Sequence, residues 1–234
     1  MELFYNPDIS GPELILPEEE SKHCIRVLRL RKDDTIYLTD GRGQLYRALL
    51  LDSDPKNTGV RIVETNSGYR KRENQLHIAI APTKNPERFE WFLEKATEIG
   101  IDEITPIICA RSERETINIR RAQRILISGM KQSQRAYLPV FNPVIQLKDF
   151  ISDKDARSKI IAHCNSRDLS LISEKFGSDS PVIVLIGPEG DFTLDEVKLA
   201  SARGFAEASL GPFIYRTETA GVMACHAFNL HFRQ

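Results

Sequence analysis

The chain has 234 residues, of which 41% are hydrophobic and 28% charged, and its formal net charge at pH 7 is −1. This composition is typical of a soluble globular protein. The near-neutral balance gives no global sign of binding to nucleic acid or membrane, so any contact with a polyanion must come from local clusters. No apolar run approaches the roughly 20 residues that cross a bilayer. The first eight residues lack the pattern of a secretory signal, so we expect a cytoplasmic protein.

The four cysteines are Cys24, Cys109, Cys164 and Cys225, which are widely separated and form no C-x-x-C pair. Structural zinc sites and disulfide frameworks both need regular spacing of their ligands. We therefore expect buried free thiols and no metal.

The first 66 residues show signals of strands and turns. A β-branched run at 35–39 precedes Asp40-Gly41-Arg42-Gly43, and an apolar run at 45–51 follows it. This pattern predicts a hairpin with Asp-Gly in its turn, and 59–63 reads as a further strand. The region is thus expected to be a small β-rich domain or barrel. The polar stretch 66–74 is the predicted boundary of this domain.

Two local clusters of basic residues stand out. The segment 21–32 carries five positive charges and no acid until Asp33, and the segment 111–135 carries seven basic residues against two acids. Such clusters suit contact with phosphates, although a solvated helix face gives the same pattern. The first cluster consists of Lys22, Arg26, Arg29, Arg31 and Lys32.

From Gln75 onward, strands and helices are expected to alternate. Runs at 76–81, 104–108 and 159–164 read as strands. The helix predicted over 85–100 has Asn85 as its N-cap, proline at the next position and Gly100 where the chain leaves the helix. Alternating elements predict an α/β domain with a mostly parallel sheet that is covered on both faces.

The stretch 181–220 contains two glycine-bearing bends, each between a strand and a helix. The first is Gly187-Pro188-Glu189-Gly190, between an apolar strand at 182–186 and a helix that a Thr193/Glu196 capping box begins and Gly204 ends. The second is Gly211-Pro212, between a short strand at 208–210 and a helix over about 217–228. Glycine permits close approach of the backbone, and helix N-termini present free N–H groups. The bends therefore predict a small-ligand site, or else two ordinary tight turns.

These motifs resemble those of one family, the RsmE methyltransferases of the SPOUT class. The similarity rests on IGPEG at 186–190, LG at 210–211 and RTETA at 216–220. It also includes His23 with Val27-Leu28-Arg29, the segment 40–43, the helix from Lys84 through Arg88 to Gly100, and Gln132-Ser133 with Arg135 and Pro139. The chain departs from the family pattern at Asp33 and Asp191, where glycine is common, at Phe213, where arginine is common, and at Tyr215, where leucine is common.

The resemblance implies a PUA-like RNA-binding domain over residues 1–70 and a SPOUT α/β domain with a deep trefoil knot over 74–234. It implies an enzyme that uses S-adenosylmethionine to methylate N3 of a uridine in 16S ribosomal RNA, the uridine that the family numbers 1498. It also implies a homodimer that acts on the small ribosomal subunit, with no metal and no membrane contact.

The resemblance also implies the residues of the site. The cofactor is expected to contact main chain and side chains around both bends, namely His163, Leu185, Gly187, Pro188, Glu189, Gly190, Leu210, Gly211, Ile214, Tyr215, Arg216, Thr217 and Ala220. RNA is expected to contact Lys22, Arg26, Arg29, Arg31, Lys32, Arg88 and Arg135.

Two residues are candidates for catalysis. Arg216 can stabilise charge that develops on the uracil ring, or it can form an ion pair at the helix entry or a dimer interface. Glu218 can accept the N3 proton, or it can interact with the helix dipole or pair with an arginine. Glu189 is either an acceptor for a ribose or a carboxylate that fixes its own loop.

Three alternatives to this function remain, of which the first two belong to other classes. One is a non-catalytic RNA-binding protein with a β-barrel domain and a degenerate α/β body. Another is a nucleotide-binding enzyme of Rossmann or P-loop type, but the sequence contains neither G-x-G-x-x-G nor G-x-x-x-x-G-K-[ST]. The third is a SPOUT methyltransferase with another RNA target.

Overall fold

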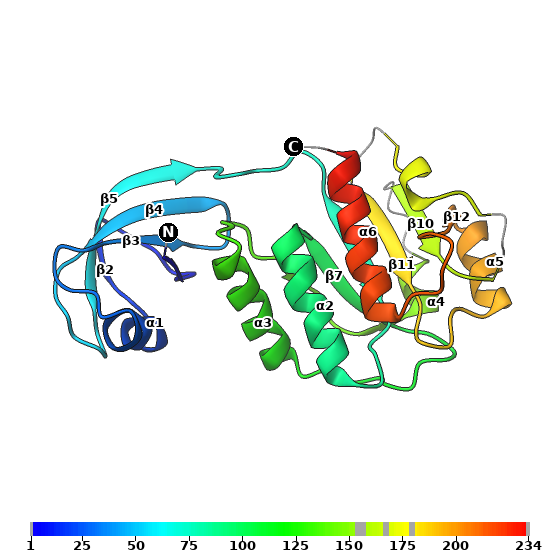
Figure 1. Cartoon of the computed structure of the whole chain (residues 1–234), viewed down its shortest axis with the longest axis horizontal. Helices are drawn as coiled ribbons and strands as arrows, with labels where there is room; N and C mark the ends of the chain where they lie inside the picture. The colour runs from blue at the N-terminus through cyan, green and yellow to red at the C-terminus, as the bar shows by residue number, and fades with distance from the viewer. Residues whose placement is uncertain (1, 153–157, 166–168, 178–180, 233–234) are drawn as a thin grey trace. The chain divides into compact units, whose positions relative to one another are not determined.

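The computed structural model describes residues 2–152, 158–165, 169–177 and 181–232. The chain divides into two compact units. Unit 1 comprises Met1–Lys71 and Ile127–Leu138, and unit 2 comprises Arg72–Leu126 and Pro139–Gln234. Figure 1 labels many of their elements, of which helix α3 (Ile119–Gln132) begins in unit 2 and ends in unit 1.

Unit 1 is built on a mixed five-stranded sheet in the order β1-β3-β4-β5-β2. Its strands are β1 (Leu3–Tyr5), β2 (Glu13–Ile15), β3 (Thr35–Thr39), β4 (Gln44–Leu50) and β5 (Gly59–Ser67). A short helix α1 (Glu18–Lys22) continues into one turn of π-helix at His23–Val27. Phe4, Ile36, Leu38 and Leu50 are among the buried side chains of its core. The predicted β-rich region is confirmed.

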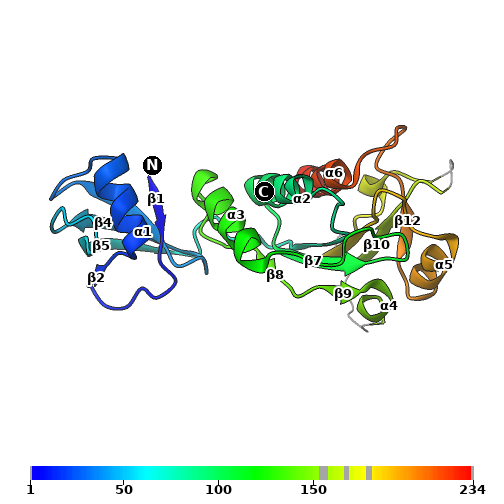
Figure 2. The same cartoon turned by 90° about the horizontal axis from the view of Figure 1, so that it is seen from below.

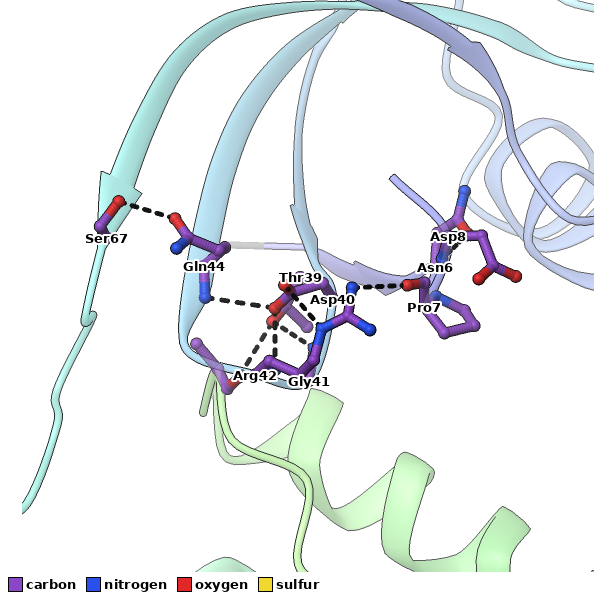
Figure 3. A network of polar contacts seen from close by, with 10 residues as sticks. Asn6, Pro7, Asp8, Thr39, Asp40, Gly41, Arg42, Gln44 and Ser67 are labelled. Atoms are coloured by element: carbon purple, nitrogen blue, oxygen red, sulfur yellow. Dashed lines mark hydrogen bonds and ion pairs between the residues drawn. The ribbon is translucent and has the colours of Figure 1, made fainter. Parts of the chain in front are cut away.

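The predicted hairpin is confirmed as β3 and β4, which pair in antiparallel register. Figure 3 shows how Asp40 fixes its turn: Oδ1 accepts hydrogen bonds from the backbone N–H groups of Arg42 (2.8 Å) and Gln44 (3.2 Å). Gly43 has φ +97°, and a Cβ there would lie 2.3 Å from the ring of Tyr137. Glycine is therefore required where the second segment of unit 1 packs against the turn.

Unit 2 contains a parallel sheet in the order β12-β10-β11-β6-β7-β8, with β9 also paired to β7. The strands are β6 (Leu76–Ile80), β7 (Glu103–Ile108), β8 (Val140–Phe141), β9 (Ile145–Gln146), β10 (Ser158–Ala162), β11 (Val182–Ile186) and β12 (Ala206–Ala208). Every residue of β6 and β11 is buried, as their unbroken apolar runs predict.

Helices cover both faces of this sheet. Figure 2 shows α2 (Pro86–Ile99) and α6 (Thr217–His231) on one side, and α4 (Leu147–Phe150) and α5 (Leu194–Ala202) on the other. A 3-10 turn lies at Ile172–Glu174. The side chain of Arg72 donates to Asn229 on α6 (2.6 Å) and to Asp102 before β7, so it anchors the first residue of unit 2 to both.

The residues predicted to cap the helices do so in the structure. Asn85 Oδ1 accepts from the N–H of Glu87 (2.9 Å), and the capping box of Thr193 and Glu196 is complete at the start of α5. The strand predicted at 208–210 is wrong in its position, because β12 ends at Ala208. Ser209 Oγ accepts from Gly211 N (3.1 Å) and donates to Gly211 O (2.9 Å), so these residues form a turn in place of extended strand.

Candidate active site

A cavity of about 260 Å³ opens in unit 2 at the carboxyl ends of β10, β11 and β12. Ligands of open parallel sheets commonly bind at this end of the strands. The lining residues come from the three segments that follow these strands and from the start of α6. They are Ala162, His163, Cys164, Ile186, Gly187, Pro188, Glu189, Gly190, Asp191, Ser209, Leu210, Phe213, Ile214, Tyr215, Thr217 and Ala220.

The two predicted bends lie together at this cavity. Thr217, the first residue of α6, is 4% exposed, and its Oγ1 donates a hydrogen bond of 3.0 Å to the carbonyl oxygen of Gly187. This bond joins the end of the second bend to the beginning of the first. The two bends therefore lie side by side at one cavity, as the sequence predicts.

The first bend is held from several sides. Glu189 Oε1 accepts from the backbone N–H of Lys84 (2.9 Å), and Gly190 O accepts from Nη1 of Arg111 (2.7 Å). Asp191 adopts φ +60°, the left-handed conformation that glycine would favour, and its carboxylate accepts from the N–H groups of Cys164 and Phe192. Glu189 thus acts as a carboxylate that fixes the loop.

The second bend is ordered at both ends but exposed between them. The Ser209 turn holds its beginning, and Thr217 holds its end. Gly211 has φ +146°, and a Cβ there would meet the Tyr215 hydroxyl at 3.0 Å. Between these points, Phe213 is 73% exposed and Ile214 is 86% exposed.

His163 borders the cavity with both ring nitrogens engaged in hydrogen bonds. Its Nδ1 accepts from the backbone N–H of Asn165 (3.1 Å), which requires that Nε2 carry the hydrogen and donate it to Glu207 Oε2 (3.0 Å). Ser201 donates to the other oxygen of Glu207 (2.9 Å). Because both ring nitrogens are used, the imidazole presents its face and edge to a ligand.

Cys164 differs from the other three cysteines because it is exposed, which corrects the expectation that all four thiols are buried. Partial burial and then the negative charge of Asp191 raise the pKa of its thiol. The thiol is therefore held in its neutral, weakly nucleophilic form beside the cavity.

The two candidate catalytic residues lie in different surroundings. Arg216 is the N-cap residue of α6, is exposed, and makes no side-chain hydrogen bond or ion pair within the described part of the chain. Glu218 is only 6% exposed; its Oε1 lies 3.9 Å from Nε of Arg88, and its Oε2 has no partner among the described residues. Neither residue lines the cavity.

The structure brings most of the predicted cofactor residues together, with three exceptions. Leu185 is fully buried in the core beneath α5, because side chains alternate along a strand and Ile186 takes the position facing the cavity. Gly211 and Arg216 also fall outside the lining. The residues missed by the prediction are Ala162, Cys164, Ile186, Asp191, Ser209 and Phe213, and each is one or two positions from a predicted one.

The basic residues predicted to bind RNA are mostly exposed. In unit 1, Arg26, Arg29, Arg31 and Lys32 are exposed, whereas Lys22 is half-buried and pairs with Glu18 (2.6 Å). Arg29 has φ +59°, so it lies at a bend of the backbone. Arg135, also in unit 1, and Arg88, in unit 2, are half-buried. The exposed cluster at 26–32 therefore has cations available for phosphate groups.

The second basic cluster is less available than its charge count suggests. Arg111 bonds to Gly190 O, Arg114 to Lys84 O, and Arg121 to Glu90. Lys131 pairs with Glu20 (2.6 Å) within unit 1. These four cations are engaged by partners within the protein. Fewer positive charges in 111–135 are therefore available to bind a polyanion than the charge count predicts.

Replacing Arg29 and Arg31 together by alanine is expected to weaken RNA binding and to flatten its dependence on salt. Each phosphate contact that is lost lowers the slope of log K against log[salt] by about 0.7–0.9. The measurement is filter binding of small-subunit ribosomal RNA at salt concentrations from about 50 to about 200 mM. An unchanged slope would remove this cluster from the interface, and Arg61→Ala, on the exposed side of β5 and paired with Glu13, is the matched control.

No helix in the described ranges is long and apolar enough to cross a membrane. Among the same residues, no group of three or more histidine, cysteine or acidic side chains could hold a metal ion.

The comparisons with known proteins agree with this architecture. Residues 70–229 match a family model described as an RNA methyltransferase domain, and residues 16–62 match one described as an RNA methyltransferase PUA domain. The ribosomal RNA small subunit methyltransferase E of Synechocystis is 30% identical over 87% of this chain and 68% of its own length. That of Rickettsia conorii is 29% identical over 89% of this chain and 86% of its own.

Solved structures are similar along almost the whole chain. A probable rRNA-methyltransferase from Porphyromonas gingivalis has a TM-score of 0.92 and 41% identity, with coverage of 99% of this chain and 98% of that one. A ribosomal RNA small subunit methyltransferase E from Neisseria gonorrhoeae, bound to S-adenosyl methionine, has a TM-score of 0.90 and 26% identity, with coverage of 98% and 97%.

Proposed function

The chain belongs to the ribosomal RNA small subunit methyltransferase E family, and from this premise we propose that it uses S-adenosylmethionine to methylate N3 of a uridine in 16S ribosomal RNA. The fold class expected from the sequence is confirmed: a SPOUT-type methyltransferase domain follows a PUA domain. The observation that carries the proposal is the Thr217 to Gly187 hydrogen bond, which makes one cavity out of the two motifs.

The residues at the cavity fit this cofactor. Ile186, Leu210 and Ile214 provide apolar surface for an adenine ring. The hydroxyl oxygens of Ser209 and Thr217 stand beside them as polar neighbours for a ribose and an amino acid group, and His163 contributes the face of its ring. Gly187 and Gly190 leave the main chain accessible along one wall. S-adenosylmethionine, when bound, supplies an electrophilic methyl group on its sulfonium sulfur.

Arg216 is the residue that we assign to charge stabilisation. Neutral uridine carries a proton on N3, and its loss leaves negative charge shared with the two neighbouring carbonyl oxygens. The exposed guanidinium of Arg216, next to cavity residues Tyr215 and Thr217, has no partner within the described residues that would neutralise it. A cation at this position stabilises the anion as it forms.

Glu218 is better placed to position Arg88 than to accept the proton. Its carboxylate is buried, does not line the cavity, and has Arg88 Nε as its nearest cation at 3.9 Å. Arg88, in the first turn of α2, is 40% exposed at its side chain and was predicted to bind RNA. We therefore assign to Glu218 the orientation of this arginine.

Glu218→Gln separates these two roles. Because glutamine keeps the shape but removes the charge that orients Arg88, we expect KM for the RNA to rise a few-fold while the single-turnover rate at saturating RNA changes by less than about threefold. General base catalysis contributes about 10²–10⁴-fold. A loss of that size in the single-turnover rate, with KM unchanged, would make Glu218 the proton acceptor.

The proposed function as a whole is tested by mapping and by binding. A methyl group on N3 blocks base pairing, so reverse transcription of 16S RNA should stop at one uridine in wild-type cells and read through it in cells that lack this gene. Calorimetry with the purified protein should show binding of S-adenosylmethionine. A changed nucleotide other than uridine would redirect the assignment to another RNA target, and a protein without affinity for the cofactor would be a non-catalytic RNA-binding protein.

We also propose that the protein acts as a homodimer in the cytoplasm, on the small ribosomal subunit. Trp91 on α2 and Leu230 on α6 are 43% and 54% exposed, and they lie on two helices that pack against each other. Exposed large apolar side chains on neighbouring helices support a protein contact at this surface. Light scattering of the purified protein gives the mass directly.

A further inference from the structure

The bend between β12 and α6 presents an aromatic ring to solvent. Phe213 is 73% exposed, yet the bend that carries it is fixed by the Ser209 turn before it and by the Thr217 bond after it. Phe213 adjoins Ile214, which is 86% exposed, so the bend presents two neighbouring apolar side chains to solvent, and contiguous exposed apolar surface marks sites of contact. Phe213 is therefore placed to receive a ligand.

The ring stands at the cavity that the proposed function assigns to the cofactor. Phe213 is one of the lining residues, together with Ile186, which is 2% exposed, and Leu210, which is half-buried. These two side chains and Ile214 already provide apolar surface for the cofactor. The most solvent-exposed aromatic ring of the lining remains for a molecule that approaches from solution.

We propose that Phe213 is the stacking platform for the extruded RNA base that receives the methyl group, an inference that rests on the proposed function. Every nucleobase has an aromatic face, and proteins that hold unpaired RNA bases stack them on aromatic side chains. Extrusion is needed because N3 of a paired base is not accessible. Phe213 would fix the plane of the base, while Arg216, three residues further along the bend, acts on its carbonyl oxygens.

The first test compares substitutions at Phe213 by kinetics. The substrate is the small ribosomal subunit purified from cells that lack this gene. For Phe213→Ala and Phe213→Leu we expect KM to rise about 5- to 100-fold, the effect of losing one base–aromatic stack, and for Phe213→Tyr a change within about twofold. Leu194→Ala, at a 61% exposed apolar residue of α5 outside the cavity, is the control and should leave KM unchanged.

The second test reads stacking directly. The chain has a single tryptophan, Trp91, so the double variant Trp91→Phe, Phe213→Trp carries its only indole at the proposed platform. Its fluorescence should be quenched when the same subunits are added in the presence of S-adenosylhomocysteine. Quenching that is absent while the subunits bind would overturn the proposal.

If a molecule other than the RNA base covers the Phe213 ring, the experiments give different results. If Phe213→Ala weakens cofactor binding in calorimetry as much as it raises KM, the ring covers the cofactor and the proposal is overturned. If Phe213→Ala and Phe213→Leu lower the mass by light scattering, a second copy of the chain covers the ring, with the same consequence. Failure of the proposed function itself is distinct, because the wild-type protein would then neither bind S-adenosylmethionine nor methylate the subunits.

Discussion

Arg216→Ala is expected to lower the rate of methyl transfer in a single turnover by about 10²–10³-fold, the usual effect of removing one preorganised charge stabiliser. Its melting temperature should stay unchanged, because the side chain is exposed, makes no cap hydrogen bond to α6, and has no ion-pair partner among the described residues. A quench experiment with excess enzyme over 16S RNA measures the rate without a contribution from product release.

Arg216→Lys serves as the companion variant. It keeps the positive charge but loses the planar fork of the guanidinium, so we expect an intermediate rate. Unchanged rates for both variants would leave Arg216 with the structural role of an ion pair at a dimer interface. A lower melting temperature for Arg216→Ala would point in the same direction.

Gly221→Ala is expected to destabilise the protein, although alanine favours helices over glycine by about 1 kcal/mol. Gly221 lies in α6, where a Cβ would come within 2.6 Å of the Phe92 ring and 2.9 Å of Ile80 Cδ1. Both neighbours are fully buried and cannot move aside. Overpacking of this kind costs about 1–3 kcal/mol, and at the upper end of that range the net loss is about 2 kcal/mol. Thermal unfolding should show a melting temperature lower by about 4–8 °C.

A double variant distinguishes crowding from other causes. Phe92→Leu alone creates a cavity and is destabilising, but it also removes the ring atoms that Gly221→Ala would meet. The two substitutions should therefore couple, with the double variant less destabilised than the sum of the single ones. Simple additivity, or a stabilising Gly221→Ala, would show that α6 and α2 are less closely packed than the structure indicates.

Elements with strong local signals were predicted well from the sequence. The ends of α2 and the start of α5 are decided by side chains within a few residues, namely Asn85, Gly100 and the pair Thr193 and Glu196, so the local sequence contains the cause. Two departures from the family pattern are explained by the structure. Asp33 and Asp191 both adopt positive φ, a conformation that glycine takes freely and that aspartate tolerates better than most residues.

Other features depend on contacts between distant residues, which a single sequence does not contain. The inclusion of Ile127–Leu138 in unit 1 depends on bonds such as Thr39 Oγ1 to Ala136 O and Gly43 N to Ala136 O, across about a hundred residues. Likewise, the count of basic residues at 111–135 could not reveal that Arg111 and Arg121 are bound to a carbonyl and a carboxylate. The placement of Glu218 beside Arg88 is of the same kind.

The hydrogen bond from Thr217 to Gly187 links the first turn of the last helix to a loop thirty positions earlier in the chain. Fraying of that helix therefore opens the binding cavity, and a ligand that fills the cavity opposes fraying. Occupancy of the cavity and local unfolding of the first turn of α6 are therefore thermodynamically linked. The ligand raises the free energy of unfolding of this turn by RT ln(1 + [L]/Kd). Amide hydrogen exchange in the first turn of α6, where Thr217 and Ala220 line the cavity, would report the saturation of the site.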